Sequence, residues 1–221
     1  MIKNNELLLE ICKISLLAGD EILQIYNDKI EVVQKKDLSP LTKADIASNK
    51  IILRSLEAID NSIPVLSEES LVNWNERKKW NKYWLVDPLD GTKEFIKKNG
   101  EFTVNIALIE NNKPILGVIY VPTKSTLYFA QQNFGSFKIN ITSELKSLDG
   151  AKKIFVSNQK IIQRVIGSRS HSNQDFDEWV KNNFPNSLIV QAGSSYKFCL
   201  IAEGSADIYP RFGPTSEWDI A

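Results

Sequence analysis

The chain has 221 residues, enough for one large domain or two small ones, and 43% of them are hydrophobic, so it can bury a sizeable core. Its 27 basic and 27 acidic residues give a formal charge of zero, which argues against a protein that coats a nucleic acid polymer or an acidic membrane. No apolar run approaches the roughly 20 residues of a transmembrane segment, no signal peptide is recognisable, and the two distant cysteines predict no disulfide framework, so we expect a cytoplasmic protein.

The N-terminal part is predicted to hold two amphipathic helices. Apolar residues recur at helical spacing from Glu6 to about Tyr26. A short strand is expected over residues 31–35, and a second helix from its capping residue Thr42 to about Ile59. Asp45 lies in the first turn of this helix, where the simplest interpretation is a carboxylate that complements the helix dipole.

Two predicted strands then end in acidic residues. Residues 63–70 form a short strand that ends in Glu68 and Glu69, and the polar segment 71–82 is a surface excursion. Residues 84–86 end a buried strand, since Pro88 is expected to stop the hydrogen-bond ladder and Gly91 to form a tight turn. Glu68 and Asp87 both follow strand ends, so they would converge if the strands are neighbours.

The turn after the second of these strands has the composition of a metal-dependent phosphate site. Asp87 and Asp90 are oxygen donors of the kind that hard cations prefer, and Thr92 opens a short helix whose free N–H groups suit phosphate. A surface turn with two solvated aspartates is the alternative. Glu68 upstream and Asp219 downstream favour the metal site.

The remainder of the chain predicts an α+β fold. Residues 102–140 alternate as an antiparallel meander, and the polar connection at 143–150 predicts two subdomains, 1–145 with most metal ligands and 146–221 with the last ligand and a substrate-phosphate pocket. Further strands are expected at 153–157, 164–167, 187–192 and 206–210, and helices at 175–184, 194–203 and from 217. This mixed order indicates α+β layers rather than a doubly wound sheet.

Three motifs together, Leu66-Ser67-Glu68-Glu69, Asp87-Pro88-Leu89-Asp90-Gly91-Thr92 and Trp218-Asp219, resemble the inositol monophosphatase superfamily of Mg²⁺-dependent, lithium-sensitive phosphatases. Segments 87–107, 193–199 and 209–214 resemble the 3′(2′),5′-bisphosphate nucleotidases within it. The resemblance covers essentially the whole chain and implies an alternating α/β/α/β/α sandwich of the sugar phosphatase type. Members continue past Trp-Asp for a further strand and helix, so this C-terminal element is expected to be missing and Asp219 to lie on a frayed terminus.

The resemblance also implies a set of metal ligands and catalytic residues. Glu68, Asp87 and the backbone carbonyl of Leu89 would hold one Mg²⁺, Asp87, Asp90 and Asp219 a second, and Glu68 would help to place a weaker third ion. Thr92 and Asp45 would orient the attacking water, which reverses the simpler interpretation of Asp45. The N–H groups of Gly91 and Thr92 would bind phosphate oxygens.

A bisphosphate substrate needs a second, cationic pocket for the phosphate that does not react. The resemblance assigns this pocket to Ser194, Lys197, Arg211 and His171. Taken singly, Lys197 is more simply a solvated helix residue, Arg211 a loop charge and His171 a helix cap. As a set at family positions, they favour the pocket.

The implied reaction is hydrolysis of adenosine 3′,5′-bisphosphate to AMP and phosphate in sulfur metabolism, with the sulfated form as a further substrate. The alternatives are a broader inositol or sugar phosphatase and a non-catalytic nucleotide-binding remnant. Peripheral attachment to the inner membrane is the alternative to a free cytoplasmic location. The sequence gives no indication of the oligomeric state.

Overall fold

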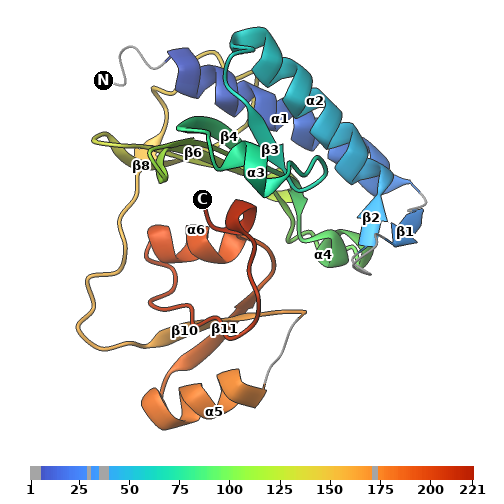
Figure 1. Cartoon of the computed structure of the whole chain (residues 1–221). Coiled ribbons are helices and arrows are strands. Elements are labelled where there is room, and N and C mark those ends of the chain that lie inside the picture. The colour runs from blue at the N-terminus through green and yellow to red at the C-terminus, as the bar shows by residue number, and fades with distance from the viewer. Residues whose placement is uncertain (1–5, 29–30, 35–39, 171–173) are drawn as a thin grey trace.

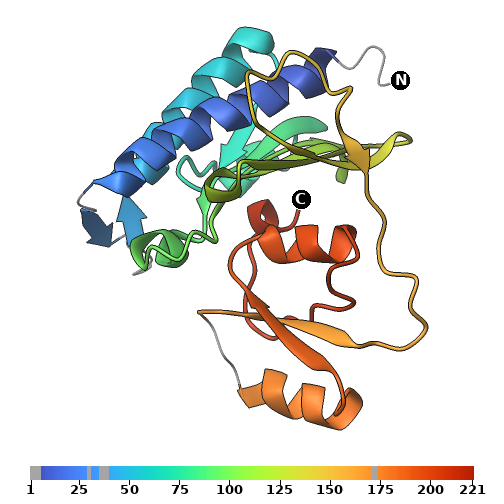
Figure 2. The ribbon, with the colours of Figure 1, turned by 180° about the vertical axis from the view of Figure 1, so that it is seen from behind.

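The computed structural model describes residues 6–28, 31–34, 40–170 and 174–221. The chain folds into alternating layers, from helices α1 and α2 through a large sheet, helix α6 and a small sheet to helix α5 (Figure 1). The view from behind shows the same succession, with the C-terminus between the large sheet and the small one (Figure 2). These layers are the α/β/α/β/α order that the resemblance implies.

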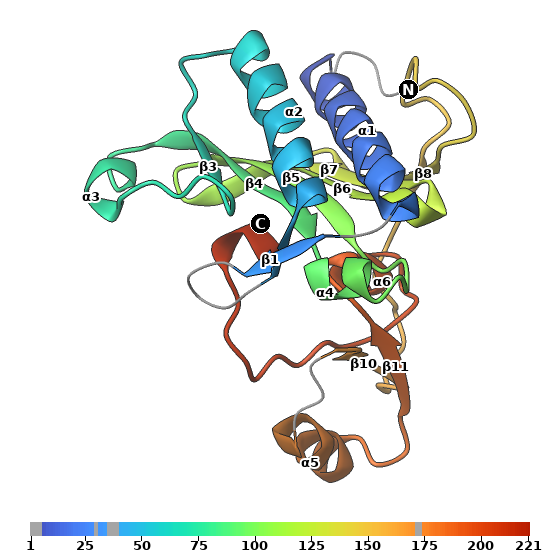
Figure 3. The same cartoon turned by 90° about the vertical axis from the view of Figure 1, so that its right-hand side faces the viewer.

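The outer layer consists of two long helices, α1 (Glu6–Asn27) and α2 (Lys43–Ile59), which lie side by side across one face of the large sheet (Figure 3). Each helix buries one stripe, for example Ile11, Ala18 and Ile22 of α1. Thr42 caps α2 as predicted, since its hydroxyl accepts the Ala44 N–H at 3.2 Å and the Asp45 side chain completes a capping box.

Within the described part of the chain, the large sheet has seven strands in the order β3-β4-β5-β6-β7-β8-β9. β3 pairs with β4 in parallel and the other neighbours are antiparallel, so the predicted meander is confirmed. The strands are β3 (Val65–Ser67), β4 (Lys82–Asp90), β5 (Thr103–Glu110), β6 (Lys113–Val121), β7 (Thr126–Gln131), β8 (Gly135–Asn140) and β9 (Lys152–Lys153).

One prediction about the central strand is wrong in an informative way. Pro88 does not end the ladder, because β4 continues to Asp90 through an irregularity in its pairing with β5. Asp87 pairs with Asn105 and Asp90 with Thr103, so three steps on β4 face two on β5. A bulge of this kind accommodates proline, which has no N–H for the ladder, and re-aims the side chains that follow.

The second part of the chain is built on two parallel strands, β10 (Arg164–Ser168) and β11 (Leu188–Ala192), joined through α5 (Gln174–Asn183). The strand predicted at 206–210 is reduced to one bridge between Ile208 and Val165. Of the strand predicted at 153–157 only β9 forms, one residue earlier, and it still belongs to the large sheet. The division into subdomains at residue 145 stays a prediction.

Short elements complete the framework around the sheet edges. Helix α6 (Tyr196–Ala202) packs beneath the large sheet, and the predicted C-terminal helix start is a single 3-10 turn, η2 (Glu217–Asp219). The others are β1 (Val32–Gln34), β2 (Pro40–Thr42), α3 (Trp74–Arg77), α4 (Thr92–Ile96) and the 3-10 turn η1 (Pro122–Lys124).

Both cysteines are buried with free thiols, Cys12 in α1 and Cys199 in α6. Among the described residues, no helix combines the length and the hydropathy that crossing a bilayer would require.

The contact between α1 and the sheet depends on a small residue at position 19. A Cβ added to Gly19 would overlap the Tyr120 ring, lying 2.6 Å from its Cδ1 and 3.2 Å from Cγ of Pro122. We therefore expect Gly19→Ala to lower the free energy of unfolding by about 1–3 kcal/mol through overpacking, although alanine favours helix by about 1 kcal/mol. Urea denaturation measures this change.

Gly117→Ala is the matched control, because a Cβ added to Gly117 in β6 would meet no atom within 4 Å. Its free energy of unfolding should equal or slightly exceed that of the unmodified protein. Equal stabilities for the two variants would contradict the close approach at Gly19.

Candidate active site

Two aspartates of β4 and a third from a distant part of the chain meet at the end of β4. Asp87 and Asp90 lie at the bulge, and Asp219 comes from η2, which packs against β4. One carboxylate oxygen from each lies within 4.8 Å of the others. Glu68 follows β3, the parallel neighbour of β4, and its N–H donates to the Val86 carbonyl at 3.1 Å, so its position is fixed beside Asp87.

Burial and mutual repulsion make this cluster a poor place for uncompensated negative charge. Burial is the main cause that raises the pKa of Asp90 to about 6, followed by the charge of Asp219, while Lys197 and the Ser195 N–H act in the opposite direction. The pKa of Asp87 is raised well above its usual range by burial and then by Asp90, Glu68 and Asp219. Burial also raises the pKa of Asp219. The cluster therefore favours a bound proton or cation.

The donor set fits a hard divalent cation. The Oδ2 atom of Asp87 is buried and has no hydrogen-bond partner among the residues that the structure describes. Its other oxygen accepts the Leu89 N–H at 3.2 Å. A buried carboxylate oxygen without a donor is rare unless an ion or water satisfies it, and an all-oxygen site of this kind suits Mg²⁺.

The raised pKa values predict how the stability of the metal-free protein depends on pH. A carboxylic acid whose pKa rises on folding contributes stability below its unfolded value, 3.8 for Asp90, and loses it as pH rises through the folded value of about 6. We expect the metal-free melting temperature to fall between pH 4 and pH 7, and Mg²⁺ to restore it at pH 7.5. Differential scanning calorimetry measures both effects, and Asp90→Asn should weaken both. A melting temperature independent of Mg²⁺ would contradict the expected binding.

Beside the cluster, Asp45 and Thr92 form a hydrogen-bonded pair. Asp45 is buried, and its Oδ2 accepts the Thr42 N–H at 2.7 Å and the Thr42 hydroxyl at 2.6 Å. Its Oδ1 accepts the Thr92 hydroxyl at 3.2 Å. The Asp45 side chain therefore serves two roles, as capping-box partner and as acceptor for Thr92, so the dipole interpretation is incomplete.

Helix α2 supports both acidic strand ends through residues that the sequence argument did not select. The Ser48 hydroxyl donates to the Pro88 carbonyl at 2.7 Å, which orients the backbone between Asp87 and Leu89. The Asn49 carbonyl oxygen accepts the Ser67 hydroxyl at 2.8 Å, next to Glu68. Both supporting residues lie three or four positions after Asp45, so helical spacing was the available signal.

The segment that opens α6 approaches the cluster from the opposite side. The N–H of Ser195 donates to Asp90 Oδ2, and the Ser195 hydroxyl donates to Asn105 Oδ1 at 2.8 Å. Lys197 is buried rather than solvated, and its Nζ donates to the Ser194 carbonyl at 2.6 Å. Burial lowers the pKa of Lys197, opposed by the charges of Asp90 and Glu94. A buried cation thus lies close enough to the acidic cluster to offset part of its charge.

Arg211 is exposed in the loop after residue 208 and donates to the Pro214 carbonyl at 2.7 Å and to the Thr215 hydroxyl at 3.1 Å. With Gln191, Tyr209 and Phe212 it lines a cavity of about 700 Å³. The charge of Arg211 acts on the pKa of both Lys197 and Asp219, so this one wall residue of the cavity links it electrostatically to the acidic cluster. His171, the remaining predicted pocket residue, lies outside the described residues.

Asp219 is held in place, contrary to the expectation of a frayed terminus. Its Oδ2 accepts the Ser216 N–H at 2.9 Å, which closes a capping box on η2. Glu217 forms an ion pair with Arg77 of the 71–82 excursion, and Trp218 packs against the apolar cluster of Leu66 and Leu85. The segment 71–82 therefore helps to hold Asp219 in place through the ion pair between Arg77 and Glu217.

The fold and the site together define a layered α+β protein with a cluster of aspartates, able to hold a metal ion, at a strand end. Residues 4–221 match the sequence profile of the Inositol monophosphatase family. A 3′(2′),5′-bisphosphate nucleotidase CysQ from Salmonella typhimurium is 45% identical over 214 residues, which span 96% of this chain and 83% of that protein. The protein of the same description from Buchnera aphidicola is 48% identical over 96% of this chain and 77% of its own length.

A solved structure agrees with these relatives. The crystal structure of CysQ from Bacteroides thetaiotaomicron, described as a bacterial member of the inositol monophosphatase family, is 39% identical with a TM-score of 0.84 over 99% of this chain and 83% of that chain. The chain belongs to the inositol monophosphatase family, which confirms the resemblance and the layered fold inferred from the motifs. Enzymes of this family are generally metal-dependent, and the acidic cluster is present here.

Proposed function

We propose that this protein is a Mg²⁺-dependent 3′(2′),5′-bisphosphate nucleotidase that hydrolyses adenosine 3′,5′-bisphosphate to AMP and phosphate, with the sulfated form as a further substrate. The relatives that are 45% and 48% identical carry the name of this activity. The observation that carries the proposal is the meeting of Asp87, Asp90 and Asp219 beside the buried cation of Lys197. Such an arrangement suits an ester phosphate at the metals and a second phosphate nearby.

The proposed metal ligands are those that the resemblance implies. Glu68, Asp87 and the Leu89 carbonyl would hold one Mg²⁺, and Asp87, Asp90 and Asp219 a second, with a weaker third ion near Glu68. Bound there, Mg²⁺ would supply a lowered pKa for water, polarised phosphoryl oxygens and a counter-charge for the leaving alkoxide. The Oδ2 atom of Asp87 is buried and has no hydrogen-bond partner among the described residues, which supports the proposed role of Asp87 as the shared ligand.

The protein's own acid–base chemistry would run through Thr92 and Asp45. The Thr92 hydroxyl donates a hydrogen bond to Asp45 Oδ1 at 3.2 Å, which leaves the lone pairs of the Thr92 oxygen free to accept a proton from the attacking water. As that proton arrives, the hydroxyl proton passes to Asp45. The two hydrogen bonds from Thr42 hold the carboxylate in orientation during this transfer. The N–H groups of Gly91 and Thr92 would bind phosphate oxygens.

The second phosphate would bind to Ser194, Lys197, Arg211 and His171. Lys197 is supplied by α6 and Arg211 by the wall of the 700 Å³ cavity, which is large enough for a nucleoside. The pKa of Lys197 is lowered mainly by burial, so a nearby dianion would favour its charged form. We retain a cytoplasmic location and a role in sulfur metabolism as predictions.

The decisive experiment is phosphate release from adenosine 3′,5′-bisphosphate with and without Mg²⁺, compared with inositol 1-phosphate. We expect Mg²⁺-dependent, lithium-inhibited release from the bisphosphate with AMP as the other product. Equal turnover of both substrates would indicate a broader inositol or sugar phosphatase. Binding of the bisphosphate without turnover would indicate a nucleotide-binding protein instead.

A further inference from the structure

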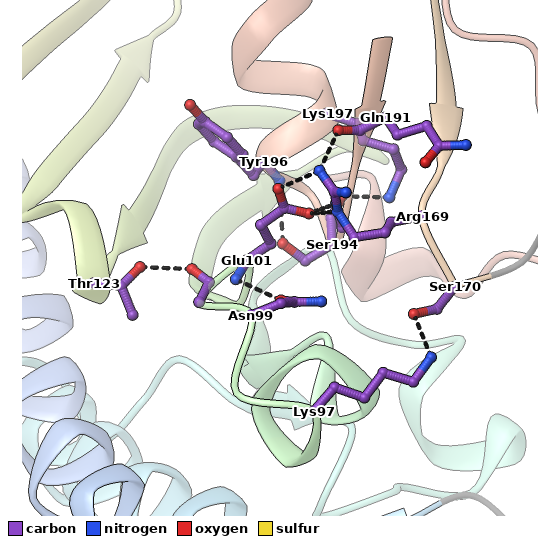
Figure 4. A network of polar contacts seen from close by, with 12 residues as sticks. Lys97, Asn99, Glu101, Thr123, Arg169, Ser170, Gln191, Ser194, Tyr196 and Lys197 are labelled. Atoms are coloured by element: carbon purple, nitrogen blue, oxygen red, sulfur yellow. Dashed lines mark hydrogen bonds and ion pairs between the residues drawn. The ribbon is translucent and has the colours of Figure 1, made fainter. Parts of the chain in front are cut away.

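A partly buried carboxylate outside the acidic cluster joins the two halves of the site. Glu101 lies in the loop between α4 and β5, and its side chain accepts from Arg169 at 2.6 Å (Nε) and 2.8 Å (Nη2) (Figure 4). The same carboxylate accepts the N–H of Gly193 at 2.8 Å. Arg169 follows β10 and also donates to the Gln191 carbonyl of β11 at 2.7 Å. One ion pair thus links the loop between α4 and β5, which follows the acidic segment 87–92, to both strands of the small sheet.

The segment 193–195 is enclosed between this ion pair and the acidic cluster. At one end Gly193 packs so closely that a Cβ there would lie 2.9 Å from the Glu101 carbonyl oxygen and would also overlap the Glu94 side chain. At the other end the Ser195 N–H donates to Asp90. Two carboxylates, Glu101 and Asp90, therefore fix the ends of one short turn.

Two of the groups that would bind the second phosphate lie on or next to this turn. Ser194 adopts a left-handed backbone with φ of 48°, an uncommon conformation for serine that needs support from its surroundings. Its carbonyl accepts Lys197 Nζ at 2.6 Å, so the position of the turn also sets the position of the buried cation. A shift of the turn would move both Ser194 and Lys197 relative to the metal ligands.

The charge of Glu101 also needs a partner for electrostatic reasons. Its side chain is only 16% exposed, and an unpaired carboxylate near a phosphate pocket would repel the substrate. The bidentate pair with Arg169 neutralises it in a fixed geometry. Arg169 therefore contacts Glu101, which holds the Gly193 N–H, and also balances the charge of Glu101.

We propose that Glu101 and Arg169 are positioning residues that hold the segment 193–197 against the acidic segment 87–92. In this way they set selectivity for a substrate with a second phosphate. This inference rests on the proposed function. Neither side chain needs to touch the substrate. Their effect is exerted through Gly193, Ser194 and Lys197.

The test uses Glu101→Gln, Arg169→Met and the double variant, with adenosine 3′,5′-bisphosphate and adenosine 3′-monophosphate as substrates. We expect KM for the bisphosphate to rise about tenfold, the scale of a lost charge-assisted hydrogen bond, with kcat within about threefold. KM and kcat for adenosine 3′-monophosphate should change little. The double variant should resemble the singles, because both remove the same pair.

Asp207→Asn is the matched control. It breaks the ion pair of Asp207 with Arg164, 2.7 Å long, at the start of the same strand β10 but without contact to segment 193–195. It should lower stability and leave the preference for the bisphosphate unchanged. An equal loss on both substrates, or the same loss in Asp207→Asn, would overturn the inference.

A second readout needs no turnover. Amide hydrogen exchange in a peptide covering residues 190–198 should be faster in the Glu101 and Arg169 variants and unchanged in the control. If the unmodified protein releases no phosphate from the bisphosphate, the proposed function fails. Hydrogen exchange alone then tests whether Glu101 and Arg169 hold segment 193–197 in place. Unchanged exchange in the peptide 190–198 would reject that positioning role.

Discussion

Replacing Asp90 with asparagine is expected to lower Mg²⁺-dependent phosphate release at least about 100-fold, since even the partners of metal ligands cost 10–100-fold. Asparagine keeps the size of the side chain but removes one of the negative charges that meet within 4.8 Å. The amide oxygen can still accept the Ser195 N–H, so the turn that opens α6 should stay in place. Steady-state phosphate release over a range of Mg²⁺ concentrations measures the loss and the shift in metal requirement.

The same variant should be as stable as the unmodified protein without metal, or more stable. Burial and the charge of Asp219 raise the pKa of Asp90 to about 6, which means that its ionised form is unfavourable near neutral pH. Asp149→Asn is the control, because Asp149 is exposed and far along the chain from the cluster. Activity of Asp90→Asn within a few-fold of Asp149→Asn would refute the proposed metal site.

The second large effect is expected at Asp45 and Thr92. Thr92→Val removes the hydroxyl that donates to Asp45 Oδ1, and Asp45→Asn removes the proton acceptor. We expect each to lower kcat about 10²–10⁴-fold with little change in KM, the usual range for general acid–base catalysis. Because the two residues act as a unit, the double variant should be no slower than the slower single. Thr92→Ser, which keeps the hydroxyl, should retain most of the activity.

A structural explanation for the Asp45 result can be separated from a catalytic one. Asp45→Asn also disturbs the capping box of α2, which should cost about 1 kcal/mol of stability. Thr42→Ala disturbs the same cap, yet leaves the hydrogen bond between Thr92 and Asp45 and the bond from the backbone N–H of residue 42. We expect Thr42→Ala to lose stability and to keep kcat within about tenfold. Equal losses of kcat in Thr42→Ala and Asp45→Asn would assign the effect to the helix cap.

Elements with strong local periodicity were predictable from the residues. The stripe of α1, the cap of α2 and the presence of a strand at β5 all depend on neighbours within a few positions. The alternation in β5 predicted a half-buried strand, which is wrong, because β5 is buried on both faces. The strand expected at 206–210 was wrong because, within the described part of the chain, that segment forms a single isolated β-bridge, between Ile208 and Val165. Whether an apolar segment becomes a strand depends on whether the edge of a sheet lies close enough to pair with it, and the tertiary structure determines this.

The candidate site divides in the same way. Asp87, Asp90 and Thr92 lie within six consecutive residues, at the end of β4 and the start of α4, and their residue types and spacing predict their chemistry. The burial of Lys197 could not be predicted from the sequence, since a lysine on a short helix is usually solvated unless another layer covers it. The contacts of Ser195 with Asp90 and of Gly193 with Glu101 join residues 105 and 92 positions apart.

The amino-acid sequence by itself determined the alternation of helices and strands, the acidic turn and the family to which its motifs belong, because these follow from short-range spacing and residue type. Only the tertiary structure decided that Asp219 reaches Asp87 and Asp90, that the bulge at Pro88 extends β4, and that Glu101 pairs with Arg169 and accepts the N–H of Gly193. The physical reason is that burial and long-range pairing set the charge state and direction of these side chains, and both arise when the layers pack.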